Sequence, residues 1–196
     1  MHELTQAKAL MIEAGRRLWQ RGLIAASDGN ISCRVAEGFL ITPSGLAKGF
    51  LTEEDLLLVD ERGRVLAGSR RPSIETGMHL AVYRACPEAQ ALVHAHPPLA
   101  TAFALTGQDM ERNAPDEVKL QLGRVAMAEY GAAGSPELAE NAAAAAPGAG
   151  AVLLRRHGAL TLGRDLEQAL FRMEALEQAA KMLLAARLLT LSPAGE

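Results

Sequence analysis

The histidines of this chain are the residues whose spacing first indicates chemistry. His94 and His96 are separated by one residue in the apolar run ALVHAH, which is typical of a short strand. Because side chains alternate along a strand, both imidazoles project from the same face, and one metal ion could contact both. The alternative is a pair of histidines with ordinary hydrogen-bond partners. Two histidines at this spacing therefore define a candidate site.

His157 adds a third imidazole at the end of a second apolar strand. It follows the run AVLLR and precedes a glycine, which allows the backbone to turn sharply. A catalytic zinc typically has three protein ligands and one position open to substrate, so His94, His96 and His157 match that number of donors. The other two histidines, His2 and His79, lie in helical segments, where we expect a structural or solvent-facing role.

The surroundings of Glu75 allow two interpretations. It lies near the start of a helical segment, one turn before His79 and behind Ser73. On residue type alone a structural role is favoured, in which the carboxylate complements the helix dipole. The turns at 28–30 and 42–45, together with the Ser73 segment, offer N–H groups and hydroxyls suited to an anion, although most such turns are simply turns. The sequence has no Walker-type loop and no G-x-G-x-x-G after a strand, so a nucleotide cofactor has no support.

The elements that must position these residues follow from hydrophobic periodicity and from the places of glycine and proline. The predicted helices cover residues 4–21, the segment capped by Ser73 and stopped by Pro87, 98–105, 135–147 and 166–190. The predicted strands cover residues 31–35, 38–42, 56–60, 64–68, 91–96, 124–130 and two short runs within 151–163. Residues 107–120 are polar and are predicted to form a surface loop. Hairpins mixed with helices predict one α+β sheet covered by helices on both faces.

Length and composition limit the class of protein. We expect a single domain over residues 1–196, because this length can bury one substantial core. A hydrophobic content of 49% and a net charge of −3 are ordinary for a soluble protein and argue against a basic nucleic-acid-binding surface. No apolar run reaches the roughly 18 residues of a membrane span, and the start does not resemble a signal peptide. With only Cys33 and Cys86, in no C-x-x-C pair, a reduced cytoplasm is the expected location.

Taken in chain order, these motifs resemble the class II aldolase/adducin family, most closely its bacterial L-fuculose-1-phosphate aldolase branch. The similarity runs through DGNIS at 28–32, LITPSG at 40–45, LTEEDLLLVD, PSIETGMHLAVYRACPEAQALVHAHPP and LLRRHGALTLG, and covers nearly the whole chain. It implies an α/β/α sandwich with a largely antiparallel central sheet. It also implies a fourfold homotetramer with active sites between neighbouring subunits.

The resemblance also implies a role for each candidate residue. The implied ligands of one Zn²⁺ ion are His94, His96, His157 and Glu75, and the glutamate is also the base. The implied phosphate pocket consists of Asn30, Ser44, Gly45 and Ser73. The implied reaction cleaves a deoxyketose 1-phosphate, such as L-fuculose 1-phosphate, to dihydroxyacetone phosphate and an aldehyde such as L-lactaldehyde, through an enediolate stabilised by zinc.

The chain departs from the aldolase branch at three places. Ile74 replaces a second serine on the phosphate side, which removes one hydroxyl. The loop 107–120 and the C-terminal tail lack the tyrosines of that branch, since Tyr83 and Tyr130 are the only two in the chain. The acid on the aldehyde side is therefore open, with Glu117 or the Tyr130 of a neighbouring subunit as candidates.

Related activities share the same metal scaffold. A sugar-phosphate 4-epimerase, a methylthioribulose-phosphate dehydratase and a decarboxylase are alternatives within the family. An adducin-like assembly module without metal is an alternative of another class. Imidazole and carboxylate ligands suit several divalent ions, so the preference for zinc comes chiefly from the family.

Overall fold

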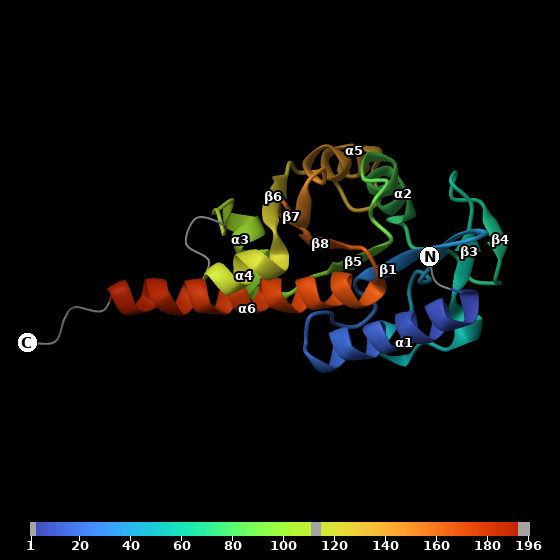
Figure 1. Cartoon of the computed structure of the whole chain (residues 1–196), viewed down its shortest axis with the longest axis horizontal. Helices are drawn as coiled ribbons and strands as arrows, with labels where there is room; N and C mark the ends of the chain where they lie inside the picture. Colours follow the sequence, from blue (N-terminus) through green and yellow to red (C-terminus); the bar gives the residue numbers. More distant parts are fainter. Residues whose placement is uncertain (1–2, 111–114, 192–196) are drawn as a thin grey trace, which may run out of the picture.

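The computed structural model describes residues 3–110 and 115–191, and a single sheet forms its centre (Figure 1). The strands are β1 (Asn30–Val35), β2 (Gly38–Ile41), β3 (Leu57–Val59), β4 (Val65–Ala67), β5 (Ala91–Ala95), β6 (Arg124–Ala128), β7 (Ala149–Leu154) and β8 (Gly158–Gly163). Their order across the sheet is β4-β3-β2-β1-β5-β8-β7-β6. All neighbouring pairs are antiparallel except β6 and β7, which run parallel. The sheet is therefore mixed but largely antiparallel, as predicted.

Helices cover both faces of the sheet, which confirms the predicted α/β/α sandwich. They are α1 (Leu4–Gln20), α2 (Thr76–Ala85), α3 (Pro98–Thr106), α4 (Asp116–Leu122), α5 (Pro136–Ala145) and α6 (Leu166–Leu191), with short 3-10 turns at Lys48–Phe50 and Glu53–Asp55. In Figure 1, α2 and α5 lie on one side of the strands, and α1 and α6 lie on the other. Within the described ranges, no helix is both long enough and apolar enough to span a bilayer.

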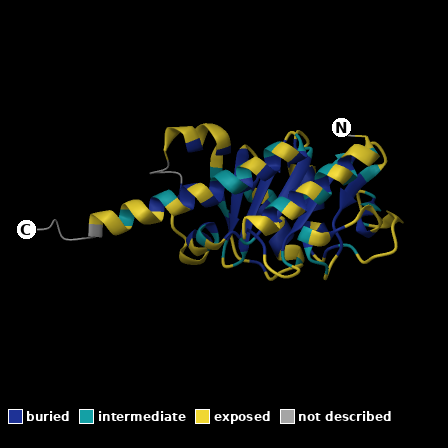
Figure 2. Ribbon diagram, turned by 90° about the horizontal axis from the view of Figure 1, so that it is seen from below, coloured by how far each residue is buried: buried dark blue, intermediate teal, exposed yellow. Residues whose placement is uncertain are grey.

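Two hydrophobic cores, one on each side of the sheet, follow from the alternation of side chains along the strands. On β5, Val93 packs into the core beneath α1 and α6, and Leu92 packs into the core beneath α2 and α5. The central strands are buried between helices whose outer faces are exposed, whereas the edge strand β4 is exposed throughout (Figure 2). Since His94 has the same parity as Leu92, its imidazole lies on the α2 side of the sheet. Cys33 and Cys86 are free, and each is buried in one of the two cores.

The prediction of a surface loop over 107–120 was wrong for its second half. Residues 116–122 form the helix α4, which packs against α6. Val118 and Leu122 lie four residues apart and are buried, whereas the polar residues of this segment face solvent. Two buried apolar positions, with the apolar Leu120 exposed between them, are too weak a signal to reveal so short a helix. Residues 111–114 lie outside the described part of the chain.

The prediction that Ser73 caps the second helix was also wrong. The helix α2 begins at Thr76 with Glu75 as the capping residue. The Ser73 hydroxyl accepts a hydrogen bond from the Glu75 N–H at 3.2 Å, and the Thr76 hydroxyl donates to the Ser73 carbonyl at 2.6 Å. These bonds form a turn that ends where the helix starts. The turn places Glu75 directly before the first residue of α2.

Candidate metal centre

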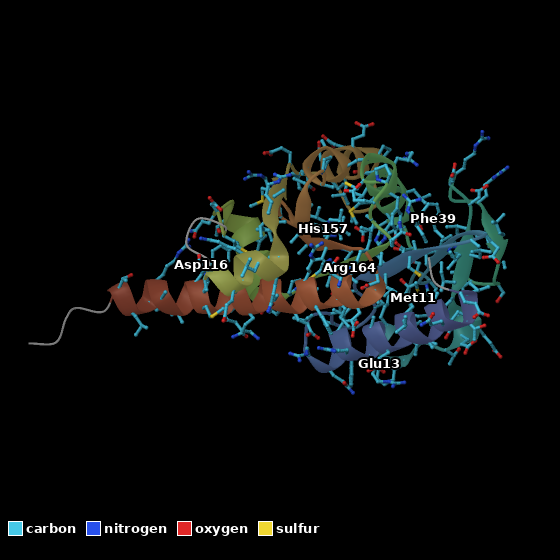
Figure 3. The ribbon with its side chains drawn as sticks, in the orientation of Figure 1. Met11, Glu13, Phe39, Asp116, His157 and Arg164 are labelled. Atoms are coloured by element: carbon cyan, nitrogen blue, oxygen red, sulfur yellow. The ribbon has the colours of Figure 1, made fainter. Side chains whose placement is uncertain are left out.

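The three candidate histidines lie at one end of the sheet. His94 is in β5, His96 directly follows this strand, and His157 directly precedes β8. Because β5 and β8 are antiparallel neighbours, with Ala95 opposite Ala159, the end of one strand lies beside the beginning of the other. Figure 3 shows His157 close to β7 and β8, inside the outline of the molecule.

Their side chains converge. The Nε2 atoms of His94 and His96 are 3.2 Å apart, and one ligand atom from each of the three histidines lies within 4.8 Å of the other two. The ring centroids are 5.0, 4.9 and 5.2 Å apart. A zinc ion bonded at about 2.0–2.1 Å to three nitrogens needs such a cluster.

The imidazoles are held in the state that binds metal. Nδ1 of His94 lies 2.9 Å from the carbonyl of Ala159, which can only accept, so Nδ1 carries the proton and Nε2 faces the cluster. Burial, followed by the charge of His94, lowers the pKa of His157 to about 4. The same two causes lower the pKa of His96. Near neutral pH, His96 and His157 are therefore neutral donors.

Glu75 completes the donor set from the α2 side. Its Oε2 lies 3.1 Å from Nε2 of His94, and its Oε1 lies 3.2 Å from Nε2 of His157. Burial raises the pKa of Glu75, but the charge of His94 and hydrogen bonds from His94 and Asn30 lower it further, so the carboxyl is ionised. Its Oε1 is buried and accepts no hydrogen bond.

These residues fit a divalent ion. Lone pairs of Glu75 and His94 face each other across 3.1 Å, so a proton or a cation must lie between them. An ionised carboxylate with one unpaired buried oxygen, together with the ring nitrogens of three histidines, offers the nitrogen and oxygen donors that zinc and several other divalent ions accept.

Three of the four predicted phosphate-pocket residues lie on two paired loops. Pro43 and Pro72 form an isolated antiparallel bridge, and the Ser44 N–H donates to the Arg71 carbonyl at 2.9 Å. Ser44 and Gly45 are exposed, whereas Ser73 is buried and bonded to Glu75. The structure thus brings the loop of Ser44 and Gly45 beside the segment that carries Ser73, and Ser73 contacts Glu75.

Asn30, the fourth, lies at the beginning of β1 and is buried beside Glu75 rather than on these loops. Its Nδ2 donates to Oε2 of Glu75 at 2.7 Å, and its Oδ1 lies 2.5 Å from Nε2 of His79. His79 is 1% exposed, and sequence reasoning did not connect it with the site. The spacing of four residues from Glu75 was the available signal, because residues i and i+4 share a helix face. His2 lies outside the described residues.

The departures from the aldolase branch have different surroundings. Ile74 is 67% exposed beside Ser73. Tyr83 is 1% exposed and hydrogen-bonded to Ser32, so substrate cannot reach it. Tyr130 is 47% exposed, and the guanidinium of Arg156, which adjoins His157, lies 5.1 Å from its ring centroid. Glu117 is exposed on α4.

Replacing Gly158 by alanine is expected to disturb the metal centre. A Cβ at this position would lie 2.6 Å from the Ala95 carbonyl and 2.6 Å from the His96 ring, and both contacts are too close. We expect zinc affinity to fall roughly 10–100-fold, as for changes in the support of a metal ligand. Competition with a chromophoric chelator measures the affinity. Gly77→Ala is the matched control because nothing lies within 4 Å of its added Cβ. Unchanged affinity in a folded Gly158→Ala protein would contradict the prediction.

His79 is expected to make the metal-free protein less stable in acid. Burial, followed by the charge of His94, lowers the pKa of His79 from 6.5 to about 3. Between these values the unfolded chain binds a proton that the folded chain does not, so stability falls as pH falls, by up to about 1.4 kcal/mol per pH unit. Above pH 6.5 this contribution is constant. Urea unfolding at pH 7, 6 and 5 should show a shallower pH dependence for His79→Gln, and parallel curves for the two proteins would refute the assignment.

Comparisons with a family profile and with known proteins point to the same family. The profile of the Class II Aldolase and Adducin N-terminal domain matches residues 9–184. The chain is 34% identical to an L-fuculose phosphate aldolase of Methanococcus maripaludis over 87% of this chain and 92% of the relative. It is 35% identical to a 3-oxo-tetronate 4-phosphate decarboxylase of Haemophilus influenzae over 93% of this chain and 88% of the relative.

A comparison with solved structures agrees with this family. The crystal structure of L-fuculose-1-phosphate aldolase from Thermus thermophilus superimposes with a TM-score of 0.88 at 35% identity, covering 98% of this chain and 100% of that one. The matched region contains all three clustered histidines and the glutamate between them. The chain therefore belongs to the class II aldolase and adducin N-terminal domain family.

Proposed function

We propose that this protein is a zinc-dependent aldolase. It cleaves a deoxyketose 1-phosphate, such as L-fuculose 1-phosphate, to dihydroxyacetone phosphate and an aldehyde such as L-lactaldehyde. The observation that carries the proposal is the convergence of His94, His96 and His157 on the carboxylate of Glu75. The similarity to L-fuculose phosphate aldolases supports the substrate class.

His94, His96, His157 and Glu75 would hold the ion. When bound, zinc supplies Lewis-acid stabilisation of the negative charge that develops on substrate oxygens next to the breaking bond. The structure positions the protein groups around it in advance, since the imidazoles are anchored at strand ends and the carboxylate at the start of a helix.

Glu75 moves the proton. In the direction of synthesis, the ionised carboxylate takes a proton from the hydroxymethyl carbon next to the carbonyl of dihydroxyacetone phosphate. In cleavage, the carbon-carbon bond breaks and its electron pair stays with the dihydroxyacetone phosphate fragment. The hydroxyl of the other fragment passes its proton to a group on the aldehyde side and becomes the aldehyde, while Glu75, protonated in this direction, gives one proton to the hydroxymethyl carbon, so no net proton is gained or lost. The hydrogen bond from Asn30 holds Oε2 of Glu75 during this exchange.

The phosphate is proposed to bind at the paired loops. Ser44 and Gly45 are exposed there, and Gly45 adopts a φ of 75°, which turns the backbone of this loop. Ser73 adds a hydroxyl near the beginning of α2, where the helix dipole favours an anion. The Asn30 amide donates one of its two hydrogens to Glu75, so the second hydrogen remains for the phosphate. With Ile74 in place of a serine, the pocket binds phosphate through one hydroxyl fewer.

Assembly into a homotetramer belongs to the proposal. Exposed apolar side chains of Trp19, Phe50 and Leu120 are available to contact other subunits. A neighbouring subunit would also bring Tyr130 toward the aldehyde end of the substrate. Sedimentation velocity on the purified protein tests the assembly, and a monomer at micromolar concentration would contradict it.

Decarboxylation of a phosphorylated 3-oxo acid is the second candidate. The similarity to a 3-oxo-tetronate 4-phosphate decarboxylase covers nearly the whole chain. In this chain, Arg156 is exposed directly beside His157, with an unusual φ of 58° for a residue that is not glycine. A guanidinium at this position suits a substrate carboxylate.

Product analysis separates these functions. The zinc-loaded protein is incubated with L-fuculose 1-phosphate, other ketose 1-phosphates, ribulose and methylthioribulose phosphates, and 3-oxo-tetronate 4-phosphate. Release of dihydroxyacetone phosphate, abolished by chelation, supports the aldolase, whereas release of carbon dioxide supports the decarboxylase. A metal-loaded protein inert toward every ketose 1-phosphate would exclude the proposed reaction. Less than about half an equivalent of zinc per chain after reconstitution would favour an assembly module.

A further inference from the structure

A chain of buried hydrogen bonds runs from the interior of the protein to Glu75. The Tyr83 hydroxyl lies 3.0 Å from the Ser32 hydroxyl, which lies 2.6 Å from Nδ1 of His79. Nε2 of His79 lies 2.5 Å from Oδ1 of Asn30, and Nδ2 of Asn30 donates to Glu75 at 2.7 Å. None of the five side chains is more than 5% exposed. Successive side chains in this series of hydrogen bonds come alternately from α2, or the residue directly before it, and from β1.

The chemistry of these groups gives every bond in the chain one direction. The Glu75 carboxylate can only accept, so Asn30 presents its N–H₂ to it and turns its carbonyl oxygen toward His79. That oxygen also only accepts, so the His79 imidazole must carry its proton on Nε2. Nδ1 is then an acceptor, and Ser32 must donate to it. With its only proton used, Ser32 accepts from the Tyr83 hydroxyl.

We propose that His79 is a positioning residue that fixes the direction of this chain and so holds the Asn30 amide with its N–H₂ toward Glu75. The inference rests on the proposed role of Glu75 as the base. Asn30 occupies Oε2, which leaves Oε1 of Glu75 without a hydrogen bond and directed at His157. The second carboxylate oxygen therefore stays free for the metal and for the substrate proton.

The opposite direction of hydrogen bonding is unfavourable where the series ends at the Glu75 carboxylate. A flipped Asn30 would place Oδ1 against the ionised oxygen of Glu75 at hydrogen-bond distance, and two acceptors repel one another in a buried site. The His79 side chain is buried, and its two ring nitrogens face the uncharged side chains of Ser32 and Asn30, so the neutral ring with a single N–H is favoured. Burial raises the pKa of Tyr83, so the hydroxyl at the far end keeps its proton. With the carbonyl oxygen of Asn30 at Nε2, a neutral imidazole must donate there and accept from Ser32 at Nδ1.

The protonation of His79 tests this directly, without any assay of activity. Nitrogen NMR of histidine-labelled, metal-free protein near neutral pH distinguishes protonated from bare ring nitrogens, and loss of one signal set in His79→Gln identifies the residue. We expect His79 to carry its proton on Nε2 and to have a bare Nδ1. A proton on Nδ1, or on both nitrogens, would overturn the inference. The tautomer itself is measured on the wild-type protein, and the variant serves only to assign the signals of His79.

Kinetics then test whether the direction matters for catalysis. The amide N–H₂ of glutamine can take the place of Nε2–H, whereas leucine leaves Asn30 without a donor. We expect His79→Leu to lower kcat of the zinc-loaded enzyme roughly 10–100-fold with KM and zinc content nearly unchanged. His79→Gln should recover most of that loss. Equal impairment of the two folded variants, or an equal change in KM, would show a merely structural role.

Tyr83→Phe is the matched control within the same chain of bonds. It removes the far hydroxyl but leaves Ser32 able to donate to Nδ1, so kcat should stay close to that of the wild type. A loss in this variant as large as that in His79→Leu would contradict the proposal. Failure of the wild-type enzyme on all sugar phosphates would refute the proposed function, while the NMR measurement would still decide the direction of the bonds.

Discussion

Replacing Glu75 by glutamine should lower kcat for cleavage of L-fuculose 1-phosphate about 10²–10⁴-fold, the usual contribution of a positioned acid or base. The amide keeps one oxygen, which can still accept from Asn30, but the N–H₂ group that replaces the other oxygen can neither bind the metal nor take up a proton. Binding of the ion should persist because three imidazoles remain. Release of dihydroxyacetone phosphate measures kcat, and elemental analysis measures zinc.

Glu177→Gln is the matched control for this change. Glu177 is another glutamate that is 3% exposed, but it accepts hydrogen bonds from the N–H groups of Leu99 and Ala100, at the beginning of α3. This variant should lose stability and keep kcat. If Glu75→Gln retained more than about a tenth of the wild-type kcat, Glu75 would not be the base.

Loss of the metal should have an effect of similar size. We expect chelation of the wild-type protein, or the substitution His157→Ala, to lower kcat/KM by about 10³-fold or more, since a bound ion supplies several kcal/mol of charge stabilisation. Zinc should restore the chelated wild-type enzyme but not the variant. The ion should also raise the thermal midpoint of the wild-type protein, because a ligand that binds only the folded state stabilises it.

Two results would contradict the prediction that loss of the metal lowers kcat/KM. One is full activity after exhaustive chelation, verified by elemental analysis. The other is a His157→Ala protein that binds zinc as tightly as the wild type, since the convergence of three imidazoles would then have no function. Circular dichroism shows whether the variant is folded before either comparison is made.

Local patterns predicted the part of the site that depends on strands. The alternation of side chains placed His94 and His96 on one face. Such a feature depends on a few neighbouring residues, which the sequence shows directly. The turn before β8 was expected at the glycine, but Arg156 makes it with a φ of 58°, and Gly158 is the first residue of the strand. The helices other than α4 followed from the same kind of local pattern, whereas the largely antiparallel sheet was implied by the family resemblance.

The contribution of Glu75 and His79 could not be read from local patterns. Both depend on how the beginning of α2 lies against β1, which no spacing within one segment reveals. Glu75 has the appearance of an ordinary first-turn glutamate, and only the family resemblance singled it out. His79 finds its partners, Asn30 and Ser32, more than 45 positions earlier in the chain. Pairings between distant segments are decided by tertiary packing.

The position of the site in the sheet affects how the protein responds to heat. The strands β1, β5 and β8 each have hydrogen-bonded neighbours on both sides, and the candidate ligands His94, His96 and His157 lie in β5 or at the ends of β5 and β8. Interior strands are commonly the last to open, so their amides should exchange with deuterium most slowly in the molecule. Thermal inactivation should then coincide with cooperative melting of the whole sheet, with no earlier fraying at the catalytic end.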